Sequence, residues 1–138
     1  MQDRAADDPE VGYEAPARPG MAEAEVLGPA LLLDLDALGR NIARMQALAA
    51  AAGLGLRPHA KTHRSAEIGR MQIEAGAVGL CCQTLAEAEA MVRGGVPDVL
   101  ITNQIVGPAR LARVAALAGR ARVGLCLDDP AAVAPLSA

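Results

Sequence analysis

The sequence predicts an α/β protein that forms about the first half of a (β/α)₈ barrel. Four short apolar runs of strand length each precede a stretch with helical spacing, and the strand ends recur every 21 to 25 residues. Such alternation is typical of βαβ units and a parallel sheet buried on both faces. The chain has 138 residues, whereas a complete barrel needs about 250. A doubly wound sheet is the alternative fold.

The repeating units can be delimited from local signals. Helices begin at an N-cap serine (Ser65), at a capping box (Thr84 with Glu87), and at prolines in the first turn (Pro108 and Pro130). Glycines close the helices before the next strand. The expected strands are LGLRP (54–58), AVGLCC (77–82), DVLITN (98–103) and RVGLCLD (122–128), and the expected helices span 65–75, 84–93, 107–118 and 129 onward.

The amino-terminal part has a different character. Residues 1–27 lack a period and contain GYEAPARPG, which predicts an extended arm, and residues 28–138 form the predicted partial barrel. ALLLDLD (30–36) has strand length, and helical spacing from Leu38 ends at Gly53.

Composition and charge exclude several classes of protein. Apolar residues make up 52% of the chain and the net charge is −3, with no basic stripe, so we expect no nucleic-acid partner. No apolar run of membrane-spanning length occurs and the first residues lack an apolar signal core, so we expect no membrane association. Three cysteines without CxxC spacing fit reduced, structural thiols in the cytoplasm.

The most informative motif is RPHAKTH (57–63), which contains the only lysine among 13 basic residues. Lys61 follows the first predicted barrel strand, and chemistry in parallel α/β folds sits at the carboxyl ends of strands. A lysine there can act as a neutral amine and form an imine with a carbonyl, which arginine cannot do. The alternative is that Lys61 is an ordinary solvated lysine.

Other polar residues near the strand ends are weaker candidates. His59 and His63 flank Lys61 and could transfer protons, or they could form a metal-binding pair that lacks a nearby third ligand. Arg57, Gln83 and Asn103 could line the same pocket or merely satisfy backbone groups. The chain has no GxGxxG, Walker or GxSxG motif.

Three stretches carry a family resemblance: GPALLLDLDALGRNIARM, the long segment from LRPHAKTHRSAEIGRM through ARVAALA, and VGLCLDDPAAVAPLSA. Over residues 28–138 they resemble the D-threonine aldolase and D-serine dehydratase family, fold-type III pyridoxal 5'-phosphate (PLP) enzymes related to the alanine racemase N-terminal domain. RPHAKTH is similar to the family's cofactor-lysine motif. The arm EVGYEAPARPGMAEAEV resembles the start of the 3-hydroxy-D-aspartate aldolase subgroup.

The resemblance implies that Lys61 holds PLP in the complete enzyme, which cleaves a D-configured 3-hydroxy amino acid to glycine and an aldehyde. It also implies a small amino-acid substrate, a possible homodimer, and a divalent metal whose ligands lie beyond residue 138. The phosphate-binding loops and a C-terminal β domain, which pairs with strand 30–35, would lie there too. The 138-residue piece is then expected to be inactive alone. The alternatives are a D-serine dehydratase, a non-catalytic truncated gene product, and a PLP-carrying protein of single-barrel type.

Overall fold

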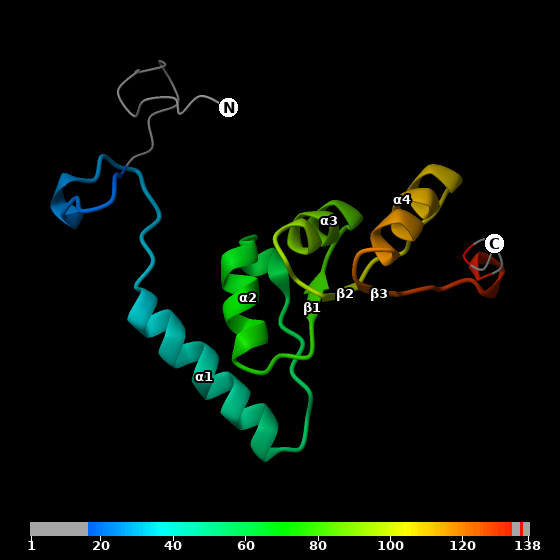
Figure 1. Ribbon diagram of the computed structural model, residues 1–138, viewed down its shortest axis with the longest axis horizontal. Coiled ribbons are helices and arrows are strands. Elements are labelled where there is room, and N and C mark those ends of the chain that lie inside the picture. The colour runs from blue at the N-terminus through cyan, green and yellow to red at the C-terminus, as the bar shows by residue number, and fades with distance from the viewer. Residues whose placement is uncertain (1–16, 134–135, 137–138) are drawn as a thin grey trace. The chain divides into compact units, whose positions relative to one another are not determined.

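The structure is a computed structural model that describes residues 17–133 and 136 (Figure 1). The chain divides into two units, one up to Asp34 and one from Leu35. Residues 1–16 of the expected arm lie outside the described residues.

The first unit contains one short 3₁₀ turn, η1 (Glu23–Glu25). Its backbone is held by the Ala22 N–H, which donates to Glu25 Oε2 over 2.8 Å. The strand expected at 30–36 is absent from the described residues, and α1 already begins at Leu35. A strand needs a neighbouring strand for its backbone hydrogen bonds, and the described residues supply none here. Three consecutive leucines of this segment are accordingly exposed, namely Leu31, Leu32 and Leu33.

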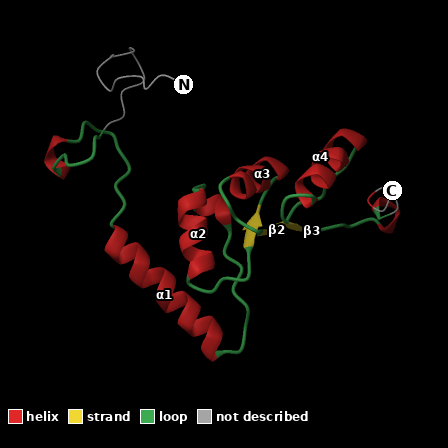
Figure 2. Cartoon of the chain, viewed as in Figure 1, coloured by secondary structure: helices red, strands yellow, loops and turns green. Residues whose placement is uncertain are grey.

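The second unit alternates helices and strands as the sequence predicts (Figure 2). Its three strands are parallel and lie in the order β1-β2-β3, which confirms the α/β class and the consecutive order expected of a barrel. The elements are α1 (Leu35–Ala51), η2 (Ala60–Thr62), α2 (Ala66–Glu74), β1 (Leu80–Cys82), α3 (Leu85–Arg93), β2 (Asp98–Ile101), α4 (Pro108–Ala118), β3 (Arg122–Leu125) and η3 (Pro130–Ala132).

The predicted helix starts are formed by the expected residues. Ser65 Oγ accepts the Ile68 N–H over 3.2 Å at the start of α2, and Pro108 is the first residue of α4. Thr84 Oγ1 accepts the Glu87 N–H over 3.2 Å at the start of α3. The reciprocal half of that capping box differs, because Glu87 Oε2 accepts the Gln83 N–H over 2.7 Å rather than that of Thr84.

Two expected elements differ from the sequence prediction. The run 54–58 forms only two backbone bonds to the neighbouring segment, from Val78 N to Leu56 O and from Cys81 N to Pro58 O, and a single parallel bridge from His59 to Cys81. The two bonds are two residues apart in one segment and three in the other, so an extra residue interrupts the ladder. Pro58, which has no N–H, also cannot donate to it.

The helix expected from residue 129 is also shorter than predicted. Asp129 Oδ1 accepts the Ala131 N–H over 2.8 Å and starts η3, which ends at Ala132. A second proline, Pro135, follows three residues later and disfavours a continuous helix, because a proline ring clashes with the preceding turn.

The helices α2, α3 and α4 pack on one face of the sheet and form the core (Figure 1). Leu80 and Cys82 of β1 and Val99 and Ile101 of β2 point to this face and are fully buried. The intervening residues belong to the opposite face, because successive strand residues alternate.

No described helix covers the opposite face, which we call the open face. It carries Cys81, Leu100 and Gly124 in one row across the strands, and all three are half-buried. Gly124 lies so close to Leu100 that an added Cβ would stand 2.9 Å from Leu100 Cδ1. The expectation of a sheet buried on both faces therefore holds for one face only within the described residues.

Candidate functional site

Lys61 lies at the carboxyl edge of the parallel strands, in the single turn η2 that follows the 54–58 run. The residue is exposed, and its Nζ is 3.4 Å from Gln83 Oε1, just beyond the end of β1. This contact is long, so the amine is held loosely and stays accessible. The structure therefore brings together two of the residues that the sequence singled out.

Both histidines of the motif hold the backbone around Lys61 in the same way. His59 Nδ1 accepts the N–H of Lys61 over 3.3 Å, and His63 Nδ1 accepts the N–H of Ser65 over 3.1 Å. Each ring thus caps the backbone two residues after its own position. A ring nitrogen that accepts a hydrogen bond carries no proton, so in the neutral form the proton sits on Nε2 of each ring.

The two Nε2 atoms have different surroundings. His59 Nε2 is 3.3 Å from Thr102 Oγ1, whose hydroxyl also lies 3.1 Å from the Cys82 carbonyl oxygen. His63 Nε2 is buried and has no hydrogen-bond partner among the described residues. A buried donor without a partner costs free energy, so His63 Nε2 is an unsatisfied atom beside the candidate site.

Gln83 is itself fixed by α3. Its N–H donates to Glu87 Oε2, and Glu87 Oε1 lies 3.9 Å from Arg64 Nε in a loose ion pair. Arg64 adopts a left-handed backbone conformation, with φ of 52°, directly after the motif. The first turn of α3 thereby holds Gln83, and the side chain of Gln83 reaches Lys61.

Arg57 and Asn103 are not brought to Lys61. The guanidinium of Arg57 contacts Asp98 Oδ1 over 2.8 Å, and Asp98 is the first residue of β2 at the amino edge of the sheet. Arg122 Nε lies 3.7 Å from the other oxygen of Asp98. Four residues of strand, about 13 Å, separate Asp98 from Thr102 at the carboxyl edge. Asn103 makes no hydrogen bond with the other candidate residues in the part of the chain that the structure describes.

Cys81 and Cys82 behave as structural groups, whereas Cys126 is exposed. Cys81, Cys82 and Cys126 are free thiols. Burial raises the pKa of the Cys82 thiol to about 12, and burial likewise raises the pKa of Cys81. A thiol must ionise to act as a nucleophile or a metal ligand, so neither residue is suited to that chemistry.

The histidine pair offers no metal centre in the described residues. No group of three His, Cys, Asp or Glu side chains there could hold a metal ion. His59 and His63 use their Nδ1 atoms on the backbone, and His59 Nε2 faces Thr102. The alternative of a metal-binding pair thus receives no support from this geometry.

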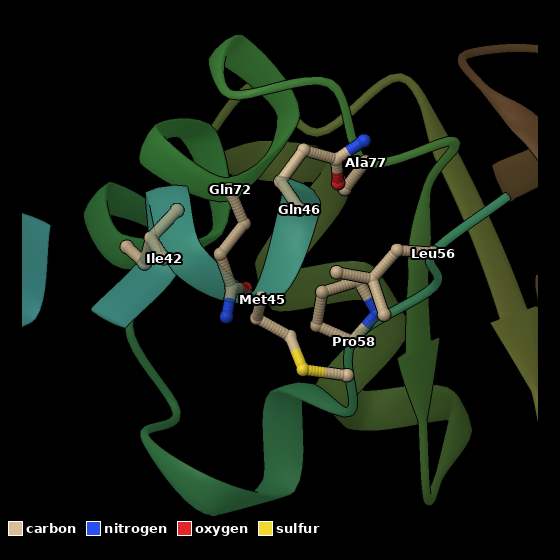
Figure 3. A pocket seen from close by; sticks show the side chains of 7 residues that line it. All are labelled: Ile42, Met45, Gln46, Leu56, Pro58, Gln72 and Ala77. Atoms are coloured by element: carbon tan, nitrogen blue, oxygen red, sulfur yellow. The ribbon is translucent and has the colours of Figure 1, made fainter. Parts of the chain in front are cut away.

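Two hollows lie near the described elements. One of about 530 Å³ lies at the ends of β2 and β3 beside the start of α4, and Asp128 and Asp129 are among its lining residues. The other, of about 210 Å³, lies between α1, α2 and the 54–58 run (Figure 3). Figure 3 shows Gln46 and Gln72 at this second cavity, where their Oε1 atoms are buried without partners among the described residues. Lys61 does not line it.

Residues 33–138 match the family model of the alanine racemase N-terminal domain. The chain belongs to this family. It is 49% identical over 131 residues to a 3-hydroxy-D-aspartate aldolase of Paracoccus denitrificans, covering 94% of this chain and 34% of that protein. The family resemblance found in the sequence is thus confirmed, and it includes a 3-hydroxy-D-aspartate aldolase.

Solved structures of the family agree. The D-threonine aldolase from Filomicrobium marinum is 48% identical with a TM-score of 0.86, over 91% of this chain and 34% of that one. The D-threo-3-hydroxyaspartate dehydratase from Delftia sp. HT23 is 39% identical with a TM-score of 0.67, over 76% of this chain and 28% of that one. The chain therefore spans about a third of the length of these relatives.

The donor set at the carboxyl edge fits the aldehyde end of PLP, the cofactor expected for this family. An exposed primary amine is available on Lys61, and the side chain in contact with it, Gln83, is neutral. The described residues offer no comparable set of groups for the phosphate end of PLP. The family resemblance implies that the phosphate-binding loops lie beyond residue 138.

Thr102 and Glu87 contact candidate residues and were not singled out for the site in the sequence. Thr102 could have been found from the alternation of β2, since Val99 and Ile101 face the core and Thr102 falls on the open face. The sequence predicted Glu87 only as the capping-box partner of Thr84. A capping box predicts that Glu87 accepts the Thr84 N–H, so it does not predict the observed bond from the Gln83 N–H.

Proposed function

We propose that the chain is part of a PLP-dependent lyase that cleaves the Cα–Cβ bond of a D-configured 3-hydroxy amino acid, giving glycine and an aldehyde. The observation that carries the proposal is Lys61. It is an exposed primary amine at the carboxyl edge of a parallel sheet, in a chain 49% identical to a 3-hydroxy-D-aspartate aldolase. The activity belongs to the complete protein, because this chain spans about a third of that relative.

In this proposal Lys61 Nζ attaches the cofactor through its aldehyde carbon. When bound, PLP withdraws electrons from the bonds at the substrate Cα and so makes their cleavage possible. The free Lys61 amine would lie beside Gln83 Oε1, which can accept a hydrogen bond from it. The Glu87 carboxylate accepts the backbone N–H of Gln83 and so keeps Gln83 beside Lys61.

The other candidate residues receive different roles. His59 and His63 hold the backbone around Lys61 through Nδ1, and the buried Nε2–H of His63 is available to an acceptor on the cofactor, the substrate or the rest of the protein. Arg57 is occupied by Asp98 at the far edge of the sheet, which supports a structural role in place of the expected cofactor contact. Asn103 stays a candidate for lining the substrate pocket.

The second candidate function is dehydration of a D-configured substrate such as D-serine. A specific observation favours keeping it: the dehydratase from Delftia sp. HT23 matches this same segment at 39% identity. Aldol cleavage breaks Cα–Cβ and requires a base at the β-hydroxyl, whereas dehydration breaks Cα–H and expels that hydroxyl. The orientation of these bonds in the site decides between them.

The attachment residue can be tested directly in the full-length protein that carries this segment. Reduction with borohydride in the presence of PLP, followed by peptide mass mapping, should place pyridoxyl on Lys61. Lys61→Ala and Lys61→Arg should both lose cofactor absorbance and activity, because arginine keeps the charge but not the nucleophile. Full cofactor absorbance and activity in Lys61→Ala would contradict the proposal.

A matched control separates position from the mere presence of an amine. The double variant Lys61→Ala/Arg64→Lys moves the amine three residues along, to an exposed position. It should remain inactive, since the moved amine no longer stands on the residue whose N–H is bound by His59 Nδ1.

The reaction is tested by product analysis with 3-hydroxy-D-aspartate, D-threonine and D-serine, with and without a divalent metal. We expect glyoxylate and glycine from 3-hydroxy-D-aspartate as the dominant products. A divalent metal should be required, and its ligands would lie outside this chain. Pyruvate and ammonia from D-serine as the dominant products would replace the aldolase by a dehydratase and leave Lys61 in place.

We also propose a cytoplasmic location and a homodimeric complete protein. The three free thiols support the first. Within the described residues, no helix has both the length and the apolar character needed to cross a membrane.

A further inference from the structure

The hydrogen bonds around His59 assign the tautomer of its neutral ring. Nδ1 accepts the Lys61 N–H over 3.3 Å, so in the neutral ring the proton must be on Nε2. Nε2–H therefore donates to Thr102 Oγ1 over 3.3 Å, which leaves the threonine hydroxyl proton for the Cys82 carbonyl oxygen at 3.1 Å. Every donor in this chain of bonds has one acceptor.

This chain of bonds joins three separate parts of the molecule. Thr102 follows β2, Cys82 ends β1, and His59 opens the turn that carries Lys61. The Thr102 N–H also donates to the Cys82 carbonyl, over 2.9 Å, so the threonine is anchored by its backbone as well as by its hydroxyl. A residue anchored at the end of β2 thereby contacts the ring of His59.

We propose that Thr102 is a positioning residue for Lys61, acting through His59. It holds His59 as the Nε2–H tautomer, so that Nδ1 stays free to accept the Lys61 N–H and to fix the turn. In this interpretation neither His59 nor Thr102 exchanges protons with the substrate. The inference rests on the proposed function only for the statement that Lys61 is the reacting amine.

The alternative is that Thr102 merely strengthens the pairing of β1 with β2 through Cys82. Two substitutions of Thr102 distinguish the cases. Thr102→Val removes the hydroxyl and keeps the shape, whereas Thr102→Ser keeps the hydroxyl. A third change, His59→Asn, keeps an acceptor in place of Nδ1 for the Lys61 N–H but removes the donor to Thr102.

The first measurement is the histidine tautomer in the full-length protein, read from ¹⁵N chemical shifts of the imidazole nitrogens and assigned with His59→Asn. We expect a pure Nε2–H signature for His59 in the parent and in Thr102→Ser. Thr102→Val removes the anchor at Nε2, so the ring can rotate away from the Lys61 N–H, to which it is bound only by a long contact of 3.3 Å; the proton can then reside on either nitrogen, and this variant should give a mixture of both tautomers. An unchanged Nε2–H signature in Thr102→Val would overturn the inference.

The second measurement is the rate at which PLP and borohydride label Lys61. Thr102→Val should slow labelling by roughly two- to tenfold, the change expected from one lost hydrogen bond, and Thr102→Ser should restore it. In the His59→Asn background, Thr102→Val should have no further effect, because its route to Lys61 is already cut. An equal loss in both backgrounds would show that Thr102 acts through the strands and would overturn the inference.

The two proposals fail in different ways. Absence of label on Lys61 in the parent would contradict the proposed function. The tautomer of His59 does not depend on PLP, so it would still decide whether Thr102 controls that ring.

Discussion

Replacing Gly69 by alanine tests how closely α2 is pressed onto the sheet beneath the candidate site. Gly69 is buried in the middle of α2. A Cβ there would stand 2.8 Å from Leu80 Cδ1 and 3.4 Å from Val96 Cγ2. Leu80 and Val96 are 0% and 1% exposed, so neither side chain can move aside into solvent. The added methyl must therefore push the helix away from the strand.

Two opposing effects set the magnitude. Alanine in a helix interior is favoured over glycine by about 0.5–1 kcal/mol, through helix propensity and backbone entropy. Overpacking a rigid core costs about 1–3 kcal/mol. The cost of the steric overlap exceeds the gain in helix propensity, so we expect Gly69→Ala to lower the free energy of unfolding by roughly 0.5–2 kcal/mol.

The matched control is Gly39→Ala in α1. Gly39 is also inside a helix, but no atom lies within 4 Å of its added Cβ. Only the gain in helix propensity applies, so this variant should be more stable by about 0.5–1 kcal/mol.

The assay is urea denaturation of the full-length protein, followed by circular dichroism at the helix band. The two alanine variants should shift the midpoint in opposite directions with similar slopes. A Gly69→Ala protein stabilised as much as Gly39→Ala would show that α2 does not rest on Leu80, and the packing argument would be refuted.

Three further predictions concern other parts of the structure. Gly107→Ala should cost about 1–3 kcal/mol although its Cβ would meet nothing within 4 Å, because φ of 95° is strained for alanine; an unchanged urea midpoint would contradict this. The hydrogen bond from Arg113 lowers the pKa of Glu89 from 4.5, so the stability advantage of the parent over Glu89→Gln should be full above that pH and lost as the pH falls through the lowered pKa. Urea midpoints near neutral pH and at about pH 3 should show a larger difference at the former. Cys82, with its pKa raised to about 12, should resist alkylation at mildly alkaline pH until urea unfolds the protein; labelling at the rate of a free thiol, measured by peptide mapping, would show that it is not buried.

Much of the fold could be predicted because its signals are local. The starts of α2, α3 and α4 follow from Ser65, Thr84 and Pro108, which act within one turn of their own positions. Strand pairing is not local, and the differences from the prediction concentrate there. The leucines of 30–36 have strand composition, but composition does not supply a partner strand. The extra residue opposite 56–58 likewise depends on how two distant segments align.

The candidate site divides in the same way. Lys61, His59 and His63 were identified because they lie together in one motif, and the backbone bonds of the two histidines span two residues. Arg57 was expected at the cofactor but lies at the opposite edge of the sheet, since its partner Asp98 lies 41 residues away. Thr102, the neighbour of Asn103, makes the contact with His59 and was not among the expected residues. A single step along a strand changes the face, so the pairing with the core was needed to place Thr102 on the side of His59.

The close approach of Gly124 to Leu100 has a consequence for how sequences of this family can diverge. The two residues are neighbours in the parallel register and share one small space, in which a Cβ on residue 124 would stand 2.9 Å from Leu100. A larger side chain at position 124 can therefore be accommodated only when the one at position 100 becomes smaller. Among homologous sequences the volumes at these two positions should vary inversely. A laboratory library that randomises both positions together should recover functional pairs that single-site libraries at either position would miss.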